Sequence, residues 1–269
     1  MDKYQVSSLA FYGTTKCTLK CKLCATGIPY IKTPVNLPKE TLFLSMERAF
    51  QIWTAEHVDF LGGEPLLHPQ ILEIMQELYK YNDNYGEMRI VTNGTIMPGG
   101  GLLDFAEYVN GSGVKLLFLL DNYGRLSGKL GEIKDELEKR KIPYRQDDYT
   151  GDSQRFNGWV DYGEYKDTGR SDEEISRVYY ECIFRNWGCI EIWNGKAYPC
   201  AYTTALEIVN GFKLKQDEYV DLFDDTIATA EKIRSAKALR GRSKPFSACR
   251  LCNGISPNSP RFPAAEQLL

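Results

Sequence analysis

The sequence predicts an α/β protein: a partial parallel barrel over residues 1–165, followed by a smaller module over residues 166–269. Up to about residue 165, short apolar runs alternate with amphipathic helical patterns. This alternation implies parallel strands joined by right-handed crossover helices. After Gly163 the pattern changes to a β-hairpin and a helix. About six strand–helix units are too few for a closed eight-fold barrel, so we expect an open or partial barrel, with a partial (β/α)6 TIM-like barrel as the fold class.

The barrel elements follow from apolar runs and their spacing. The expected strands are Leu9–Gly13, His57–Leu61, Met88–Thr92, Val114–Leu120, Pro143–Asp147 and Trp159–Tyr162. Helices are expected between them, at 39–53, 70–81, 102–109 and 126–140, because apolar residues recur there on one stripe. Ligands of such folds bind at the carboxyl ends of the strands, so we expect the functional site there.

The smaller module is predicted from one helix at about 174–180, a hairpin and a second helix at about 226–239. The hairpin comprises Cys189–Trp193 and Lys196–Tyr198, because Asn194-Gly195 between them is a strong hairpin turn. The tail at 255–269 contains several prolines, so we expect it to be poor in helix and to lie over the surface.

Composition excludes several classes of protein. The net charge of −3 and the pI of about 5.6 give no electrostatic footprint for duplex nucleic acid or an anionic membrane. The densest apolar run, at 116–120, is too short to span a bilayer, and the N-terminus lacks a secretion signal. We therefore expect a cytoplasmic protein with neither a nucleic-acid nor a membrane partner. In that setting eight cysteines indicate metal binding or catalysis before disulfides.

Three of these cysteines, Cys17, Cys21 and Cys24, directly follow the first expected strand. Three thiolates within eight residues can bind one metal centre, and they are one ligand short of a closed four-thiolate site. An open position is what a catalytic metal centre needs. The alternative is a zinc site completed by a distant residue.

The Cys-x3-Cys-x2-Cys segment, with Leu23 before its third cysteine, resembles the cluster motif of radical S-adenosylmethionine (SAM) enzymes. The resemblance implies that the three cysteines hold a [4Fe–4S] cluster whose fourth iron is chelated by S-adenosylmethionine. Reductive cleavage of this cofactor would yield a 5′-deoxyadenosyl radical that abstracts hydrogen from the substrate. A flavodoxin or ferredoxin-type reductant would supply the electron.

Three later segments resemble the cofactor-binding parts of the same family. Gly62-Gly63-Glu64-Pro65 follows the second expected strand and resembles the family's GGEP motif, whose carboxylate would accept from the methionine ammonium group. Thr92 and Asn93 end the third strand, near the expected cofactor ribose and carboxylate. Asp121 ends the fourth strand, where it would reach the ribose hydroxyls. The structural alternative at each place is a tight turn or a polar strand end.

A second set of cysteines comprises Cys182, Cys200, Cys249 and Cys252. Two separated ligands and a Cys-x2-Cys knuckle can close a tetrahedral four-sulfur site, and this geometry allows zinc or an iron–sulfur cluster. The arrangement resembles the shortened twitch form of the SPASM auxiliary module of radical SAM enzymes. The resemblance implies a second [4Fe–4S] cluster, acting in electron transfer or in structure.

The expected function is oxidation of a secondary alcohol in a sugar, aminocyclitol or other polyol, with the auxiliary cluster accepting an electron. Only sixteen residues precede Cys17, fewer than a leader-peptide-binding domain needs, so we expect a small-molecule substrate before a peptide. One alternative is radical epimerisation of a sugar or peptide residue, with Cys189 as hydrogen donor. Another is a zinc-binding structural or interaction protein.

Two residues near Cys200 bear on the substrate. Anaerobic sulfatase-maturing enzymes have an aspartate directly after the corresponding cysteine; Ala201 stands here, which argues against that activity. An aminocyclitol dehydrogenase of the family has an acidic residue one position further, where this sequence has Tyr202. We expect Tyr202 to be a packing aromatic, and Cys189 to be a half-buried core thiol.

Overall fold

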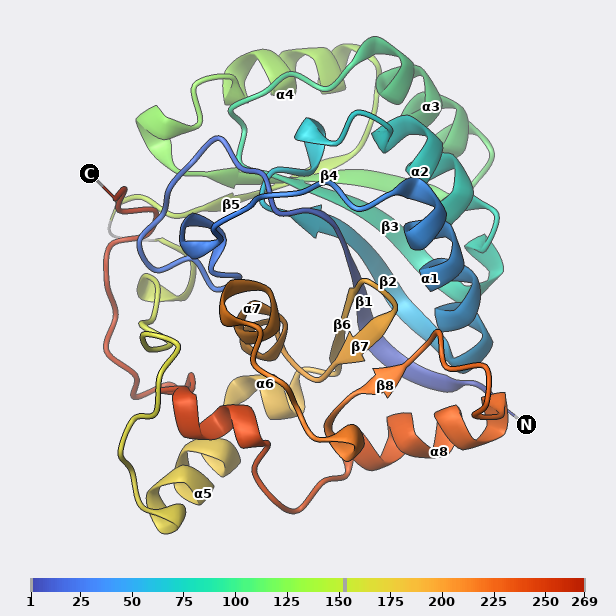
Figure 1. The fold of residues 1–269 in the computed structure, drawn as a ribbon. Coiled ribbons are helices and arrows are strands. Elements are labelled where there is room, and N and C mark those ends of the chain that lie inside the picture. Colours follow the sequence, from blue (N-terminus) through green and yellow to red (C-terminus); the bar gives the residue numbers. More distant parts are fainter. Residues whose placement is uncertain (1, 152–153, 269) are drawn as a thin grey trace.

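The computed structural model describes residues 2–151 and 154–268, which form a curved sheet flanked by helices (Figure 1). Within these residues the sheet has the strand order β5-β4-β3-β2-β1-β6-β7-β8. The strands are β1 (Tyr4–Thr14), β2 (Trp53–Gly62), β3 (Tyr85–Thr92), β4 (Lys115–Asn122), β5 (Tyr144–Asp148), β6 (Cys189–Trp193), β7 (Lys196–Tyr198) and β8 (Val220–Asp221). Strands β1 to β6 pair in parallel, whereas β7 and β8 are antiparallel additions. The predicted α/β class with a partial barrel is confirmed.

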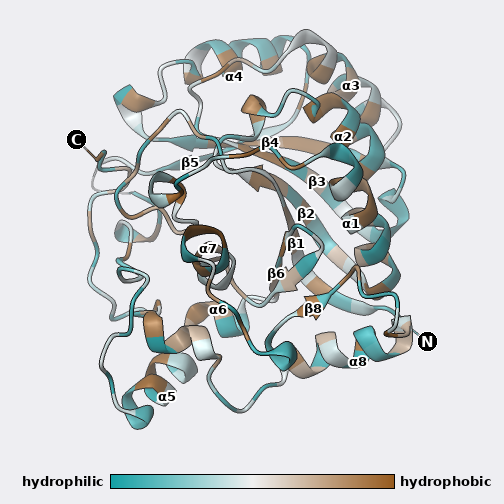
Figure 2. Cartoon of the chain, viewed as in Figure 1, coloured by the Kyte–Doolittle hydropathy of each residue, from teal (hydrophilic) through white to brown (hydrophobic). Residues whose placement is uncertain are grey.

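Helices α1 to α4 and α8 lie along the outer side of this sheet, and α7 lies on its inner side (Figure 1). Their bounds are α1 (Lys39–Ile52), α2 (Ile71–Tyr79), α3 (Gly100–Gly111), α4 (Leu130–Lys139), α5 (Asp172–Glu181), α6 (Ile183–Asn186), α7 (Ala201–Asn210) and α8 (Thr229–Arg240). Apolar and polar residues occupy different sides of the outer helices (Figure 2). Each helix therefore covers the sheet with its apolar stripe.

Strand β1 is the centre of the core. Its last seven residues are all buried, and Leu9 and Phe11 are fully so. Met46 and Phe50 of α1 are buried in the same core. A strand buried on both faces is expected in the middle of a parallel sheet covered by helices.

The expected sixth strand at Trp159–Tyr162 is wrong. This segment makes only an isolated bridge between Trp159 and Phe262. Gly158 and Gly163 flank it with φ of 114° and 111°, values outside the strand region, so the backbone turns at both ends. The sixth parallel strand is β6, which pairs with β1 from Ser8 opposite Cys189 to Phe11 opposite Ile192.

The predicted hairpin is confirmed as β6 and β7, but it belongs to the barrel sheet. Helices α6 and α7 were not predicted. The tail is free of helix, as expected, yet it does more than lie over the surface, because Ala265 is 2% exposed. The Lys22 amide donates to Glu266 O at 2.7 Å, and the Leu268 amide donates to Lys20 O at 2.8 Å. The tail therefore pairs with the loop that carries Cys21.

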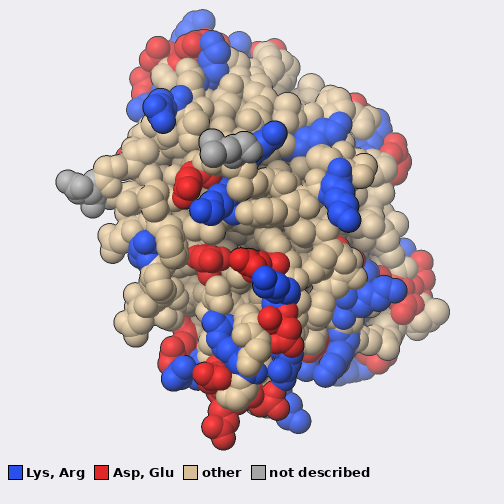
Figure 3. All heavy atoms as spheres, turned by 60° about the vertical axis from the view of Figure 1, so that its left-hand side comes forward, with Lys and Arg blue, Asp and Glu red and all other residues tan. Residues whose placement is uncertain are grey.

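Acidic and basic side chains are interspersed over the face shown in Figure 3, in keeping with the small net charge. Among the described residues, no helix combines the length and apolar character that crossing a membrane requires.

Candidate active site

The loop after β1 brings Cys17, Cys21 and Cys24 to a cavity of about 830 Å³ that opens to solvent. The ends of three neighbouring strands line the same cavity, through Gly62 and Gly63 of the β2 end, Thr92 and Asn93 of the β3 end, and Asp121 of β4. All these positions lie at the carboxyl edge of a parallel sheet, which is where ligands of such folds bind. The structure thus gathers most of the sequence-predicted residues at one place.

The three sulfur atoms are held by different partners. Cys17 Sγ accepts from the Leu19 amide at 3.4 Å and from Asn93 Nδ2 at 3.6 Å. Cys21 Sγ accepts from Gln267 Nε2 at 3.2 Å, and Cys24 Sγ lies 3.2 Å from Thr26 Oγ1. Burial raises the pKa of Cys17 to about 11 and that of Cys21 to about 12. Metal binding displaces such protons, so this all-thiol donor set fits a soft metal centre.

Gly62 and Gly63 allow the end of β2 to approach the cysteine loop. A Cβ atom on Gly62 would lie 2.3 Å from Thr14 O, and one on Gly63 would lie 2.2 Å from Lys16 O. The amide of Gly63 donates to Thr14 O at 2.8 Å, and that of Glu64 donates to Lys16 O at 2.8 Å. The two glycines therefore fix the loop of Cys17 against the second strand.

Glu64 is fully buried and ties the strand ends together. Its Oε1 accepts from the Leu66 amide at 3.1 Å, and its Oε2 accepts from the Asn93 amide at 2.9 Å. Burial raises the pKa of this carboxyl to about 7, although the backbone donors oppose the shift. Pro65, also buried, begins the short turn Pro65–Leu67 that Glu64 caps.

Asn93 connects the third strand to the cysteine loop. Its Nδ2 reaches Thr18 Oγ1 at 3.2 Å as well as the Cys17 sulfur, and its Oδ1 accepts from the Thr95 amide at 3.1 Å. Thr92, buried beside it, accepts from the Gly94 amide at 3.3 Å. Both side chains are therefore fixed before any ligand binds.

Asp121, near the end of β4, lines the same cavity. Burial raises the pKa of Asp121 to about 7, and the Tyr123 hydroxyl donates to its Oδ2 at 3.3 Å. Tyr123 and Trp159 complete this wall, with ring centroids 5.7 Å apart in an edge-to-face arrangement. A carboxyl between an aromatic wall and an open cavity is suited to bind hydroxyl groups.

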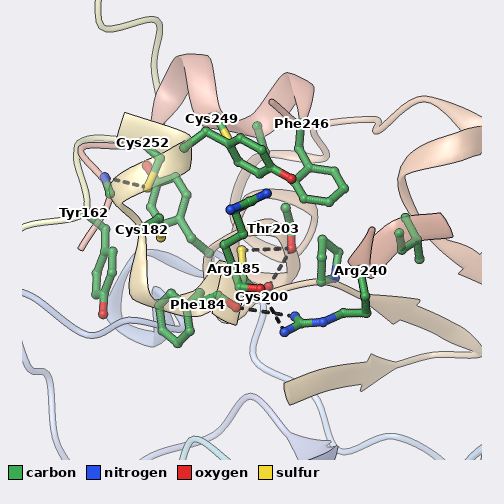
Figure 4. A pocket seen from close by; sticks show the side chains of 16 residues that line it. Tyr162, Cys182, Phe184, Arg185, Cys200, Thr203, Arg240, Phe246, Cys249 and Cys252 are labelled. Carbon is green, nitrogen blue, oxygen red and sulfur yellow. Dashed lines mark hydrogen bonds between the residues drawn. The ribbon is translucent and has the colours of Figure 1, made fainter. Parts of the chain in front are cut away.

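The second set of cysteines also meets at one cavity. Cys182, Cys200, Cys249 and Cys252 line one hollow (Figure 4). They come from three separate places: the end of α5, the start of α7 and the turn Ser247–Leu251 with the residue after it. Burial raises the pKa of Cys200 to about 11, and burial also raises the pKa values of Cys249 and Cys252.

The rest of this second cavity is aromatic and cationic. Its described lining includes Arg185 and Arg240 and neither a carboxylate nor an imidazole. Arg240 donates to the carbonyls of Phe184 and Arg185, while Nε of Arg185 is buried without a partner among the described residues. Four thiols facing two guanidinium groups suit an anionic thiolate-bound centre. Among residues 2–151 and 154–268, no three His, Cys, Asp or Glu side chains gather closely enough to hold a single metal ion.

Three other sequence-predicted residues take different places. The Cys189 thiol, on β6, donates to Glu191 Oε1 at 3.7 Å, within the wall formed with β1. Tyr202 is 2% exposed, stacks on Tyr165 and donates to Leu251 O at 2.9 Å, so it packs as expected. Leu23 lines the hollows next to the first cysteine cavity.

Sequence reasoning missed Gln267, Tyr123 and Trp159 at this site. Gln267 contacts Cys21 across 246 residues of chain, in a tail that carries no motif. Tyr123 follows the fourth strand two residues after Asp121, so its place beyond a strand end was the one available indication.

One protein-family model matches the N-terminal part of the chain. The family described as the Radical SAM superfamily matches residues 11–142, a range that contains Cys17, Cys21, Cys24 and the ends of β2, β3 and β4. No curated protein matches the sequence. Residues 11–142, just under half of the chain, are thus similar to the radical SAM superfamily, and this match supports a radical SAM enzyme. That family implies a [4Fe–4S] cluster and S-adenosylmethionine.

Solved structures extend the likeness in fold to the whole chain. BtrN in complex with AdoMet and 2-DOIA shares 15% identity at a TM-score of 0.59, over 97% of this chain and 98% of that one. Histidine-tagged anSMEcpe with bound AdoMet shares 13% identity at a TM-score of 0.54, over 98% and 93%. Streptococcus suis SuiB bound to precursor peptide SuiA shares 15% identity at a TM-score of 0.49, over 97% and 75%. At these identities the first two show a common fold alone.

Proposed function

We propose that this protein is a radical SAM oxidoreductase with two [4Fe–4S] clusters that oxidises a secondary alcohol of a small sugar, aminocyclitol or polyol. The observation that carries the proposal is the second cavity, where four cysteines from three segments converge beside Arg185 and Arg240. Oxidation of an alcohol removes two hydrogens, and abstraction of one hydrogen atom leaves one proton and one electron to be taken. A second redox centre within the protein is a suitable acceptor for that electron.

In this proposal Cys17, Cys21 and Cys24 hold the first cluster, and S-adenosylmethionine takes the open position. When bound, the two groups supply the 5′-deoxyadenosyl radical that abstracts hydrogen. Gly62, Gly63, Thr92, Asn93 and Asp121 line the cavity that would receive the cofactor. Leu23 lines the hollows beside that cavity, and Pro65 begins the turn that Glu64 caps.

Glu64 has a double role in the proposal. Its two oxygens already accept the amides of Leu66 and Asn93, so it positions the strand ends. The methionine ammonium group would be a second donor to one of these carboxylate oxygens, although Glu64 is fully buried in this structure and is not among the residues that line the cavity.

The second cluster is assigned to Cys182, Cys200, Cys249 and Cys252 of a twitch-type module within residues 166–269. Full ligation by four thiolates leaves no open iron for substrate, so this cluster would transfer electrons. The unpartnered Nε of Arg185 and the charge of Arg240 would offset the negative charge of the thiolates. An external flavodoxin or ferredoxin-type protein would reduce the first cluster.

Anaerobic reconstitution with iron and sulfide tests the cluster assignment. We expect about eight irons per chain, from two four-iron clusters. Cys21→Ala should abolish formation of 5′-deoxyadenosine. The double variant Cys249→Ala, Cys252→Ala should keep it and lose substrate oxidation. A colourless zinc protein, or 5′-deoxyadenosine from Cys21→Ala, would contradict the enzyme assignment; full turnover by the double variant would remove the second cluster from the reaction.

A mass measurement on candidate polyols separates the two reactions. Loss of two hydrogens identifies dehydrogenation. A product that takes up deuterium from heavy water but keeps its number of hydrogens would show that the reaction is epimerisation. Cys189 would then be the candidate hydrogen donor. We expect oxidised product, and we expect Cys189→Ala to keep most activity, because the thiol is engaged with Glu191 within the sheet.

A further inference from the structure

A third hollow adjoins the cavity assigned to the first cluster. The two share Ala25, Tyr123 and Trp159 as lining residues, so they are neighbours with a common wall. Six aromatic side chains line the third hollow: Tyr123, Tyr149, Phe156, Trp159, Tyr162 and Trp187. A substrate lying here would be next to the place where the radical forms.

Contacts between aromatic rings hold the wall of this hollow in place. Tyr123 stacks on Tyr149 with centroids 5.1 Å apart, and Trp159 stands edge-on to both rings, at 5.7 and 6.3 Å. Phe156 and Trp187 form another edge-to-face pair, at 6.0 Å. Broad apolar faces of this kind can pack against the C–H face of a sugar ring while hydroxyl groups point elsewhere.

Arg261 is the one charged residue in the described lining of this hollow. Its Nη2 donates to Ser256 O at 3.0 Å. Its Nη1 is buried and has no hydrogen-bond partner within residues 2–151 and 154–268. A buried cationic N–H without an acceptor is costly, so the arrangement favours a ligand that brings one.

The tail holds Arg261 firmly in the wall. Phe262, the next residue, exchanges backbone hydrogen bonds with Trp159, at 2.8 and 2.9 Å. A Cβ atom on Gly158 would lie 2.6 Å from Phe262 O, so glycine at this position permits the approach. Arg261 is therefore fixed beside the aromatic surface before a ligand arrives.

We propose that this hollow is the substrate subsite and that Arg261 binds an anionic oxygen group, a phosphate or a carboxylate, on a substrate whose ring lies against the aromatic wall. A planar guanidinium group matches the paired oxygens of either anion. The inference rests on the proposed function and narrows its substrate class from polyols in general to sugar phosphates or sugar acids.

Calorimetric titration of the reconstituted protein with S-adenosylmethionine bound tests the subsite. The probes are inorganic phosphate, glucose 6-phosphate, glucuronate and glucose. We expect at least one anionic sugar to bind more tightly than glucose. Arg261→Gln should weaken that binding about 10-fold to 100-fold, the usual effect of losing a charge-assisted hydrogen bond. Arg261→Lys should restore part of it. Preference for glucose 6-phosphate over glucuronate assigns the phosphate, and the reverse assigns the carboxylate.

Arg234→Gln is the matched control, since Arg234 is exposed on α8 and the substitution removes the same charge. It should bind every probe as the unmodified protein does. Equal titrations of all four probes by the unmodified protein and Arg261→Gln would overturn the subsite.

The titration needs no turnover, so it fails or succeeds separately from the proposed function. Anion binding lost in Arg261→Gln, with no substrate ever oxidised, would keep the subsite and refute the dehydrogenase. Oxidation of neutral polyols at equal rates by both proteins would refute the subsite and keep the dehydrogenase.

Discussion

Glu191 is a buried acid inside the barrel wall. It lies on β6 and is 5% exposed; one oxygen accepts the Cys189 thiol, and the other has no partner among the described residues. Burial, with a further contribution from the charge of Asp59, raises the pKa of Glu191 from 4.5 to about 7, while the nearby Tyr12 hydroxyl and the Cys189 thiol oppose the shift. The folded protein therefore holds this proton more tightly than the unfolded chain.

This shift predicts a stability change with a definite sign. Because the folded state binds more protons, Glu191 lowers the free energy of unfolding as pH rises from 4.5 to about 7. Glu191→Gln removes this decrease of the unfolding free energy with pH. Relative to the unmodified protein, the variant should gain about 1–3 kcal/mol in unfolding free energy between pH 4 and pH 8. Thermal unfolding at both pH values measures the difference. Glu64 and Asp121 titrate in both proteins, so their contributions cancel in the difference between the variant and the unmodified protein. A stability difference that does not depend on pH would contradict the raised pKa of Glu191.

At the scale of elements, local sequence predicted most strands and helices but not every pairing between strands. The hairpin was predictable because Asn194 and Gly195 take φ of 47° and 76°, which Asn-Gly favours. Trp159–Tyr162 and Cys189–Trp193 are both short apolar segments, and nothing local says which of them pairs with β1. The pairing is decided by tertiary contacts between residues about 180 positions apart, such as Ser8 and Cys189.

In the candidate site, the residues at strand ends were predictable from the sequence, and those in the C-terminal tail were not. Topology alone brings one group of residues to one edge of the sheet, because each lies at the carboxyl end of a strand or in the loop after it. This group comprises Cys17 to Cys24, Gly62 to Pro65, Thr92, Asn93 and Asp121. Gln267 contacts Cys21, and Arg261 lines the adjoining hollow, although both belong to a tail without periodic pattern. Their positions depend on backbone pairing with Lys20, Lys22 and Trp159, which no local pattern encodes.

The junction between β2 and the cysteine loop yields a second prediction. Gly63→Ala places a Cβ 2.2 Å from Lys16 O and 2.9 Å from Cys17 Cβ, and backbone atoms cannot yield as a flexible side chain can. The loop must shift, so we expect the reconstituted variant to lose most of the iron of the first cluster. Iron analysis and the cluster absorption measure this.

Gly131→Ala is the control for that variant, because nothing lies within 4 Å of a Cβ at Gly131 in helix α4. It should load iron fully, and alanine should favour the helix by a few tenths of a kcal/mol to about 1 kcal/mol. Normal iron loading in Gly63→Ala would show that the loop tolerates the added methyl group and that the contact is not needed for the site.

At the scale of the whole molecule, the two expected modules share one sheet. β6 comes from residues beyond 165 and pairs along β1, and α8 packs on the outer side of β1. The fully buried Leu9 and Phe11 lie in the paired stretch. The barrel is thus completed by the second half of the chain, and the expected boundary near 165 does not divide the core.

A fragment comprising residues 1–165 should therefore not fold as an independent barrel. Removing β6 leaves the edge of β1 from Ser8 to Phe11 without its partner, and removing α8 uncovers apolar surface beside it. Open apolar strand edges associate with one another, so we expect the fragment to be insoluble or aggregated in size-exclusion chromatography. Co-expression of residues 166–269 as a second chain should restore a soluble complex, since it returns β6 and α8. A monomeric fragment that unfolds cooperatively and loads the first cluster alone would show instead that β1 can close the barrel as an edge strand.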